Sequence, residues 1–446
     1  MTKFPQEGLP RAEVLQALDD YKKQDGDWKG GKTWSLVYYA GDEITQLAEE
    51  AYLKYFHANG LNPFVFQSLK RLETETLSMT ADLFHGDASV VGALTSGGSE
   101  SILMALKTYR DEARALKPEI AQPEVIVPIS VHAAFEKAAH YFGLRLIHAP
   151  LADDYRADVN AIEQLITPNT ILLVGSAPQY PHGVIDPIEE LSQLALKYHL
   201  RLHVDACLGG FTLPFIRALG GDVPAFDFEL PGVSSISADL HKYAFAAKGV
   251  SALLYRDAAL REYQYFAYGD WPGGLFISPS ATGTRPGGAI ASAWAALRCI
   301  GRDGYLRITQ GVLETTQKLL AGIRAIPELH VLGDPPAGIF AFASDILNVH
   351  ALADALERKG WVIDQQVNPA NLHFMVTPAH ADVADDFLND LRDAVAEVKA
   401  HPEQFAQGSA ALYGMRAAVN DPSVVNQLIK GAYSRFMTDG GVFSFE

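Results

Sequence analysis

Residues 94–110, LTSGGSESILMALKTYR, run from the end of an apolar strand through the turn Ser96-Gly97-Gly98-Ser99 into a helix. The start of such a helix offers unpaired N–H groups, the positive end of the helix dipole and a serine hydroxyl, and glycine lets an anion approach the backbone. The turn therefore suits a phosphate group. On its own it is also typical of an ordinary capped helix, so its meaning depends on the rest of the chain.

Short β-branched segments follow this turn and alternate with amphipathic stretches. They are VIVP (125–128), RLIHAP (145–150), TILLVGSA (170–177), RLHVDAC (201–207), SSISAD (234–239) and VSALLYR (250–256). Strands that alternate with helices predict an α/β fold with a mostly parallel sheet. We predict that this large domain spans residues 61–315, after an N-terminal arm and helix in 1–60. Residues 316–446 are expected to form a smaller C-terminal α+β domain.

Composition is that of an ordinary globular protein and limits the partners. The chain has 446 residues, 48% of them apolar, and its 36 Lys and Arg against 53 Asp and Glu give a net charge of −17. Such a charge repels nucleic acid and anionic membrane surfaces. Only Cys207 and Cys299 occur, which excludes a disulfide framework, shows no metal-ligand spacing and favours a reducing compartment.

We also expect a cytoplasmic protein without a transmembrane segment. The opening residues lack the apolar core of a secretory signal. The uncharged stretch from Ile166 to Ile185 contains three prolines, so it is a poor candidate for a membrane helix.

Two further positions can carry chemistry. Asp205 ends the segment RLHVD, and a carboxylate at the end of a strand in such a sheet can reach a bound ligand, although it can equally cap a loop. Lys242 follows the segment SISAD in an apolar setting that could lower its pKa and let it form a Schiff base, although a surface lysine is the commoner case.

Together, a phosphate cradle, a carboxylate and a lysine are what pyridoxal 5'-phosphate needs. Its phosphate must be anchored, its pyridine nitrogen kept protonated and its aldehyde held covalently. The chain is indeed similar to fold-type-I pyridoxal phosphate enzymes of the group II decarboxylase superfamily. Within it the chain resembles the retro-aldol lyases that act on phosphorylated sphingoid bases. The similar stretches include TSGGSESILMALKTYR, PISVHAAFEKAAHYFG, LHVDACLGGF, SADLHKYAFAAKG and SPSATGTRPGG, and weaker similarity reaches ALYGM at 411–415.

The resemblance implies cofactor roles position by position. Lys242 matches the lysine that holds the cofactor as a Schiff base, Asp205 the partner of the pyridine nitrogen, and His132 the histidine stacked on the ring. The remaining matches concern the cofactor phosphate: Gly97, Gly98, Ser99, His241 and, from a partner subunit, Ser278.

It also implies a site for the substrate phosphate. Lys248 matches a phosphate-binding lysine, and Tyr38 matches a tyrosine that reaches the neighbouring subunit's site. Asn62 stands where many relatives have a histidine, and Tyr180 where several have phenylalanine. Asn62 can donate hydrogen bonds but carries no charge.

The activity implied is cleavage of sphingosine 1-phosphate, or a similar phosphorylated long-chain base, to a fatty aldehyde and phosphoethanolamine, in a homodimer with shared sites to which residues 1–60 contribute. Lys242, Tyr38 and the substrate phosphate are candidates for the base. An L-amino-acid decarboxylase on the same scaffold is the alternative, and a non-catalytic interaction protein is a third possibility.

Overall fold

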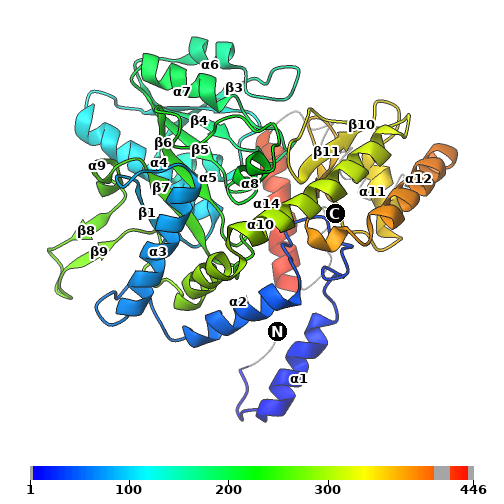
Figure 1. Ribbon diagram of the computed structural model, residues 1–446, viewed down its shortest axis with the longest axis horizontal. Helices are drawn as coiled ribbons and strands as arrows, with labels where there is room; N and C mark the ends of the chain where they lie inside the picture. The colour runs from blue at the N-terminus through cyan, green and yellow to red at the C-terminus, as the bar shows by residue number, and fades with distance from the viewer. Residues whose placement is uncertain (1–3, 406–421, 440–446) are drawn as a thin grey trace.

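A seven-stranded sheet lies at the centre of the part that the computed structural model describes, residues 4–405 and 422–439 (Figure 1). In the order β1-β7-β6-β5-β4-β2-β3, β7 is antiparallel to its two neighbours and the other pairs are parallel. The carboxyl ends of all strands except β7 therefore meet at one edge, and the predicted mostly parallel α/β sheet is confirmed. The strands are β1 (Val91–Thr95), β2 (Glu124–Pro128), β3 (Arg145–Ala149), β4 (Thr170–Ser176), β5 (Arg201–Asp205), β6 (Val233–Ala238) and β7 (Ser251–Tyr255).

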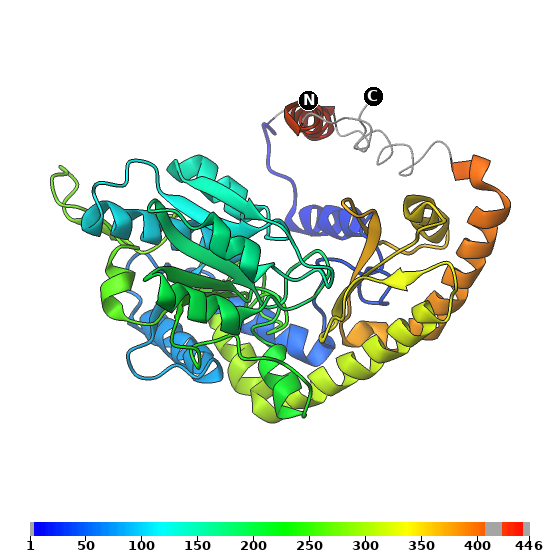
Figure 2. The same ribbon diagram turned by 90° about the horizontal axis from the view of Figure 1, so that it is seen from above.

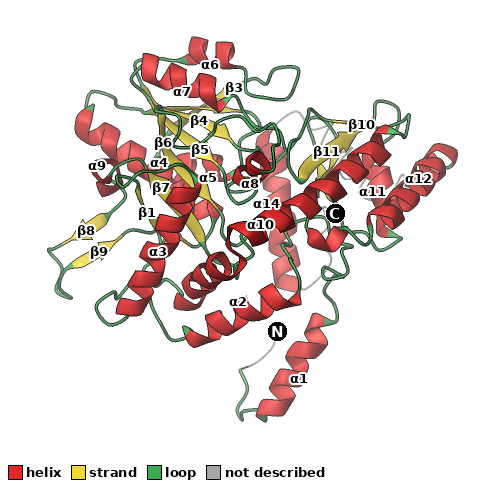
Figure 3. Cartoon of the chain, viewed as in Figure 1, coloured by secondary structure: helices red, strands yellow, loops and turns green. Residues whose placement is uncertain are grey.

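Helices cover both faces of this sheet (Figure 3). Every residue of β4 and β6 is buried, as expected for strands enclosed on two sides. One face packs against α4 (Gly98–Leu116), α5 (Ala134–Phe142) and α9 (Ala258–Glu262). The other packs against α3 (Gln67–Leu83), α6 (Val159–Leu165), α7 (Ile188–Lys197), α8 (Leu213–Ala218) and the first half of α10 (Gly287–Arg324).

Helix α10 joins this sheet to a second one, as Figure 2 shows. It bends at Gly301, whose φ of 59° is left-handed, and it continues through residue 315, so the predicted domain boundary falls inside a helix. Along the described chain, the second sheet has the antiparallel order β10-β11-β13-β12. Its elements are β10 (His330–Val331), β11 (Ile339–Ala343), α11 (Val349–Glu357), β12 (Asp364–Gln366), β13 (Asn371–Met375), η1 (Pro378–His380), α12 (Ala384–Ala400) and η2 (Pro402–Phe405), and α14 (Pro422–Asp439) follows.

The N-terminal segment contributes to this second sheet. The Trp34 amide donates to the Val362 carbonyl over 3.0 Å, and its indole stacks on the His380 ring at 4.2 Å, fully buried. Part of the predicted arm therefore belongs in space with the C-terminal sheet. The rest forms α1 (Arg11–Lys22) and α2 (Asp42–Lys54), and α2 packs along α10.

A short hairpin, β8 (Phe266–Tyr268) with β9 (Phe276–Ser278), projects beside α9 (Figure 1). Two further observations concern earlier expectations. Among the described helices, none is both long and apolar enough to cross a bilayer. The stretch ALYGM at 411–415 lies outside the described residues.

Candidate active site

A cavity of about 330 Å³ opens at the carboxyl edge of the larger sheet. Ligands of open α/β sheets bind at this edge. The cavity brings together seven of the predicted site residues, which come from the end of β5, the first turn of α4 and the turns after β1, β2 and β6. They are Gly97, Gly98, Ser99, His132, Asp205, His241 and Lys242.

Lys242 lies in the turn after β6, with its Nζ 3.0 Å from Asp239 Oδ2. Burial favours the neutral amine, but the negative charges around it, Asp239 foremost and Asp205 also, outweigh burial and raise the pKa of Lys242 above its ordinary value. The expectation of a lowered pKa was therefore wrong, because it considered only the apolar surroundings. Asp239 was missed from the sequence, although its position three residues before Lys242 was a visible signal.

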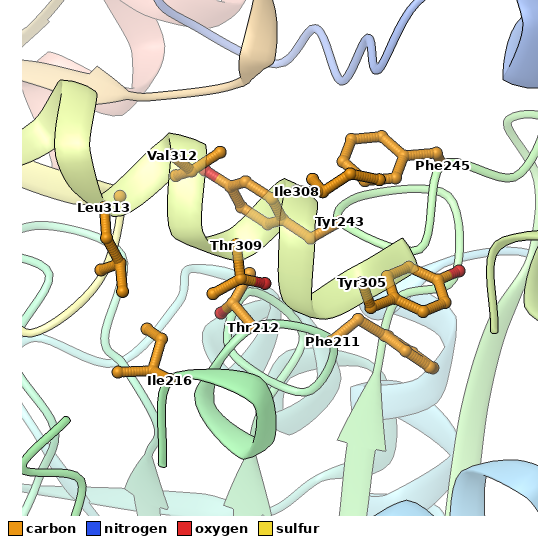
Figure 4. A pocket seen from close by; sticks show the side chains of 11 residues that line it. Phe211, Thr212, Ile216, Tyr243, Phe245, Tyr305, Ile308, Thr309, Val312 and Leu313 are labelled. Atoms are coloured by element: carbon orange, nitrogen blue, oxygen red, sulfur yellow. The ribbon is translucent and has the colours of Figure 1, made fainter. Parts of the chain in front are cut away.

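The residues after Lys242 are anchored from two directions. The Tyr243 hydroxyl donates to the Val376 carbonyl and the Tyr305 hydroxyl to the Ala244 carbonyl, each over 3.0 Å. Figure 4 shows Tyr243 and Tyr305 beside α10, around an apolar space. That space is only about 10 Å³, too small for a ligand, so it serves packing. The backbone that carries Lys242 is thus held by both sheets and α10.

Asp205 ends β5 and is buried. Its Oδ1 accepts hydrogen bonds from the Cys207 amide at 3.1 Å and the Ser237 hydroxyl at 3.2 Å. Among the described residues, both hydrogen bonds to the Asp205 carboxylate end on Oδ1, so Oδ2 remains for a ligand in the cavity.

The start of α4 lies directly against the turn after β6. A Cβ on Gly98 would come within 2.7 Å of Asp239 Oδ2 and 2.8 Å of Cys207 Sγ, so this position needs glycine. His241 Nδ1 accepts from the amides of Gly249 and Val250 at 3.3 and 3.2 Å. Its proton is therefore on Nε2, a donor beside the turn that precedes α4.

His132 and Tyr180 border the same cavity. His132 Nδ1 accepts from the Ala134 amide at 3.1 Å, and the His132 ring lies 6.3 Å from the Tyr180 ring, edge to face. The Tyr180 hydroxyl donates to Asp364 Oδ2 at 2.8 Å, across to the second sheet. Tyrosine in place of phenylalanine thus adds a contact between the two sheets.

Lys248 and Tyr38 meet in an adjoining groove of about 600 Å³, which shares Leu36 with the cavity. Lys248 Nζ lies 4.6 Å from the centre of the Tyr38 ring and donates to the His241 carbonyl at 3.0 Å. Burial, with a smaller effect of the Lys242 charge, lowers the pKa of Lys248 to about 8. Tyr38 also packs on Tyr243 of its own chain, so its position does not support the prediction that it serves a neighbouring subunit.

Two predicted residues lie outside this cavity and groove. Asn62 is exposed, and its Oδ1 accepts from the Val65 amide at 3.2 Å. The buried Ser278 hydroxyl donates to the Ser280 carbonyl at 3.0 Å. Their loops are neighbours, because the Gly60 amide donates to the Arg285 carbonyl at 2.9 Å.

The donor set fits pyridoxal phosphate from end to end. A helix start with the Nε2–H of His241 suits the phosphate, and the free Oδ2 of Asp205 suits a protonated pyridine nitrogen. Lys242, between them, has the amine that the aldehyde requires. The fold and this set define a pyridoxal phosphate-dependent enzyme of fold type I.

Comparison with known proteins agrees with this assignment to the pyridoxal phosphate-dependent enzymes. Residues 37–344 match the family described as pyridoxal-dependent decarboxylase conserved domain. Sphingosine-1-phosphate lyase of Arabidopsis thaliana is 44% identical over 96% of this chain and 79% of its own, and sphingosine-1-phosphate lyase 1 of Mus musculus 41% over 95% and 75%. The structure of a Burkholderia pseudomallei sphingosine-1-phosphate lyase superposes with a TM-score of 0.87 at 40% identity, covering 95% of this chain and 98% of that one. This chain belongs to the pyridoxal-dependent decarboxylase family and, within it, to the sphingosine-1-phosphate lyases.

Proposed function

We propose that this protein cleaves sphingosine 1-phosphate, or a closely similar phosphorylated long-chain base, to a fatty aldehyde and phosphoethanolamine. The observation that carries the proposal is the Lys248 cation beside the Lys242 cavity, in a chain of this family. A cation there suits a substrate phosphate close to the bond that breaks.

Pyridoxal phosphate, when bound, links covalently to the substrate amine, and its protonated ring accepts the electron pair that the breaking carbon–carbon bond releases. We assign Asp205 Oδ2 to hold the proton on the ring nitrogen. We assign the start of α4, with Gly97, Gly98, Ser99 and His241, to anchor the cofactor phosphate, and His132 to lie on the ring. Asp239, 3.0 Å from Lys242, holds the lysine ammonium in place when it is free of the cofactor.

The geometry narrows the choice of base for the 3-hydroxyl proton. The Tyr38 hydroxyl donates to Met375 Sδ at 3.1 Å, and burial, with the negative charge of Asp239, raises the pKa of Tyr38 well above its ordinary value. A phenol that holds its proton so firmly is a poor base. The raised pKa of Lys242 likewise keeps the released lysine protonated, so it is a poor base for the same reason. We therefore favour the substrate phosphate, and assign Tyr38 to orient Lys248.

A homodimer is part of the proposal. Asn62 and Ser278 lie on neighbouring loops outside their own chain's cavity, so one subunit interface can bring both into a partner's site, Ser278 toward the cofactor phosphate and Asn62 toward the substrate phosphate. We also propose a cytoplasmic location, supported by the exposed free thiol of Cys299, which is typical of a reducing compartment.

Product analysis tests the reaction. The purified holoenzyme is incubated with sphingosine 1-phosphate, with unphosphorylated sphingosine and, separately, with L-aspartate and L-glutamate. Fatty aldehyde and phosphoethanolamine in equal amounts from the first substrate are expected, with little turnover of the second. Release of carbon dioxide from the amino acids without aldehyde from the lipid would instead establish the decarboxylase alternative.

A further inference from the structure

A line of buried polar side chains runs from helix α4 to Asp205. His203 and Asp205 are two residues apart on β5, so their side chains face the same side of the sheet. The same holds for Ser235 and Ser237 on β6. The strand register pairs His203 with Ser235 and Asp205 with Ser237. Tyr109 of α4, the helix whose first turn forms the phosphate end of the site, covers the far end of this line.

Each neighbour along the line is within hydrogen-bond distance. The Tyr109 hydroxyl lies 2.5 Å from Ser235 Oγ, and Ser235 Oγ lies 2.8 Å from His203 Nδ1. His203 Nε2 lies 3.3 Å from Ser237 Oγ, which lies 3.2 Å from Asp205 Oδ1. All five residues are buried.

Assigning each hydrogen to a donor gives the line one direction of hydrogen-bond donation, from Tyr109 to Asp205. Among the described residues, Ser235 Oγ is the hydrogen-bond partner of the Tyr109 hydroxyl. Because a buried hydroxyl hydrogen needs an acceptor, we infer that Tyr109 donates to Ser235 and that Ser235 donates its own hydrogen to His203 Nδ1. A neutral His203 ring with an acceptor at Nδ1 carries its proton on Nε2.

The second half of the line follows from that proton position. His203 Nε2–H donates to Ser237 Oγ, and the Ser237 hydroxyl is left to donate to the carboxylate, which can only accept. With the other tautomer, His203 Nε2 would accept the Ser237 hydrogen, and Asp205 would lose this donor.

His203 stays neutral in this line. Burial lowers the pKa of His203 to about 4, although the Asp205 carboxylate opposes the effect. The aromatic ring of Phe135 lies 6.0 Å from the imidazole. The line therefore orders hydrogen bonds without adding a charge beside the cofactor.

We propose that His203 is a positioning residue for Asp205. Its Nε2–H tautomer, set by Tyr109 and Ser235, turns the Ser237 hydroxyl onto Asp205 Oδ1. That donor fixes the carboxylate with Oδ2 toward the ring nitrogen and makes Asp205 a weaker base, so the shared proton stays on the nitrogen. The inference rests on pyridoxal phosphate occupying the cavity and is independent of which substrate is cleaved.

The first test reads the imidazole itself. Long-range ¹H–¹⁵N spectra of protein labelled in histidine, recorded at pH 7 with and without cofactor, identify His203 by the signal that the variant His203→Gln lacks. A neutral ring with its proton on Nε2 is expected in both forms. A proton on Nδ1, or a charged ring, would overturn the proposal.

The second test reads the cofactor nitrogen, using ¹⁵N-labelled pyridoxal phosphate in variant holoenzymes. His203→Phe keeps a ring but no donor, and its pyridine signal should move toward that of the neutral nitrogen. His203→Gln can still donate to Ser237 and should return most of the shift. In His203→Phe kcat should fall about 10-fold with little change in KM, since the lost interaction acts on the electron sink.

Controls separate positioning from folding. His380→Gln, a change of a buried histidine in the second sheet, should leave the pyridine signal unchanged. Should His203→Phe not fold, Ser237→Ala removes the final donor directly and should move the signal in the same direction. A wild-type pyridine signal in either folded variant would sink the proposal. The imidazole and pyridine signals are recorded without substrate, so an error in the substrate assignment would leave both spectroscopic results standing.

Discussion

Lys242 is surrounded by negative charge, and its removal is the plainest test of the site. Lys242→Ala should lose both the visible absorption of the bound cofactor and turnover, because among the described residues Lys242 is the one lysine that lines the cavity. Absorption spectra before and after borohydride reduction, followed by peptide mass mapping, check this. Lys197→Ala, at an exposed lysine paired with Glu163, is the matched control and should keep both properties. A borohydride-stable cofactor adduct in Lys242→Ala would disprove the assignment.

Asp205→Asn should retain cofactor but lose most activity. A neutral amide cannot keep the ring nitrogen protonated, and a charge-assisted hydrogen bond is worth about 1.5–3 kcal/mol, or roughly 10- to 150-fold in rate. Steady-state kcat with saturating pyridoxal phosphate measures the loss. Turnover close to wild type would remove Asp205 from this role.

Lys248 predicts a pH dependence with a definite sign. With a pKa of about 8 in the folded free enzyme, Lys248 loses its charge as the pH rises through 8, so kcat/KM for the phosphorylated substrate should fall there. Unphosphorylated sphingosine should show no such fall.

Titration of Lys248 also affects the free energy of unfolding, which should rise with pH where kcat/KM falls. The unfolded chain keeps the ordinary lysine pKa of 10.5, so between pH 8 and 10.5 it binds more protons than the folded chain, and this group's contribution makes stability rise with pH. Lys248→Met should abolish both effects and cost about 2–4 kcal/mol in transition-state binding of the phosphorylated substrate. An equal loss on both substrates would place Lys248 in support of the fold or cofactor.

At the scale of elements, the contact between α4 and the turn after β6 predicts that Gly98 cannot be replaced by a residue with a side chain without loss of stability. Gly98→Ala forces a Cβ against Asp239 and Cys207 and should cost about 1–3 kcal/mol of stability, with weaker cofactor binding. Thermal unfolding and cofactor titration measure the two effects. Gly311→Ala in α10, where a Cβ meets nothing within 4 Å, is the control and should stabilise the protein slightly. Unchanged cofactor affinity in Gly98→Ala would contradict this account of the turn.

The elements that were predictable from sequence are those whose patterns are local. The β-branched runs at 170–177 and 234–239 mark strands, because burial on two faces of the sheet leaves its trace in neighbouring residues. The placement of Trp34 was not predictable, since its partner Val362 is remote in sequence.

The features of the candidate site also divide into those that the sequence could predict and those that it could not. The turn before α4, Asp205 and Lys242 each ends or follows a recognisable strand, so their meeting at one sheet edge could be expected. The raised pKa of Lys242 could not, because it depends on a carboxylate whose distance only the folded turn decides. The prediction that Tyr38 serves a neighbouring subunit stays a prediction, since sequence does not say which copy of Lys248 it meets.

At the scale of the whole molecule, site residues that serve their own chain and site residues that serve a partner subunit predict different outcomes when inactive variants are mixed. Tyr38→Ala, which removes the ring that orients Lys248, mixed with Lys242→Ala should recover no activity, because Tyr38 lies with its own chain's Lys248. Ser278→Asp mixed with Lys242→Ala should recover about a quarter of wild-type activity, since half of the random dimers then carry one intact site of two. Subunit exchange is verified with differently tagged chains. Recovery in the first mixture, or none in the second despite exchange, would reverse the assignment of that residue to its subunit.

The burial of Trp34 among residues 362–387 also sets an order of events during translation. At about 5–20 residues per second, the ribosome needs roughly 15–65 s after making Trp34 to reach Val362. Throughout that time the indole has no site to occupy, whereas β1 to β7 are complete by residue 255. The larger sheet can therefore form on the nascent chain, while the second sheet closes over Trp34 only after residues 362–387 have been made.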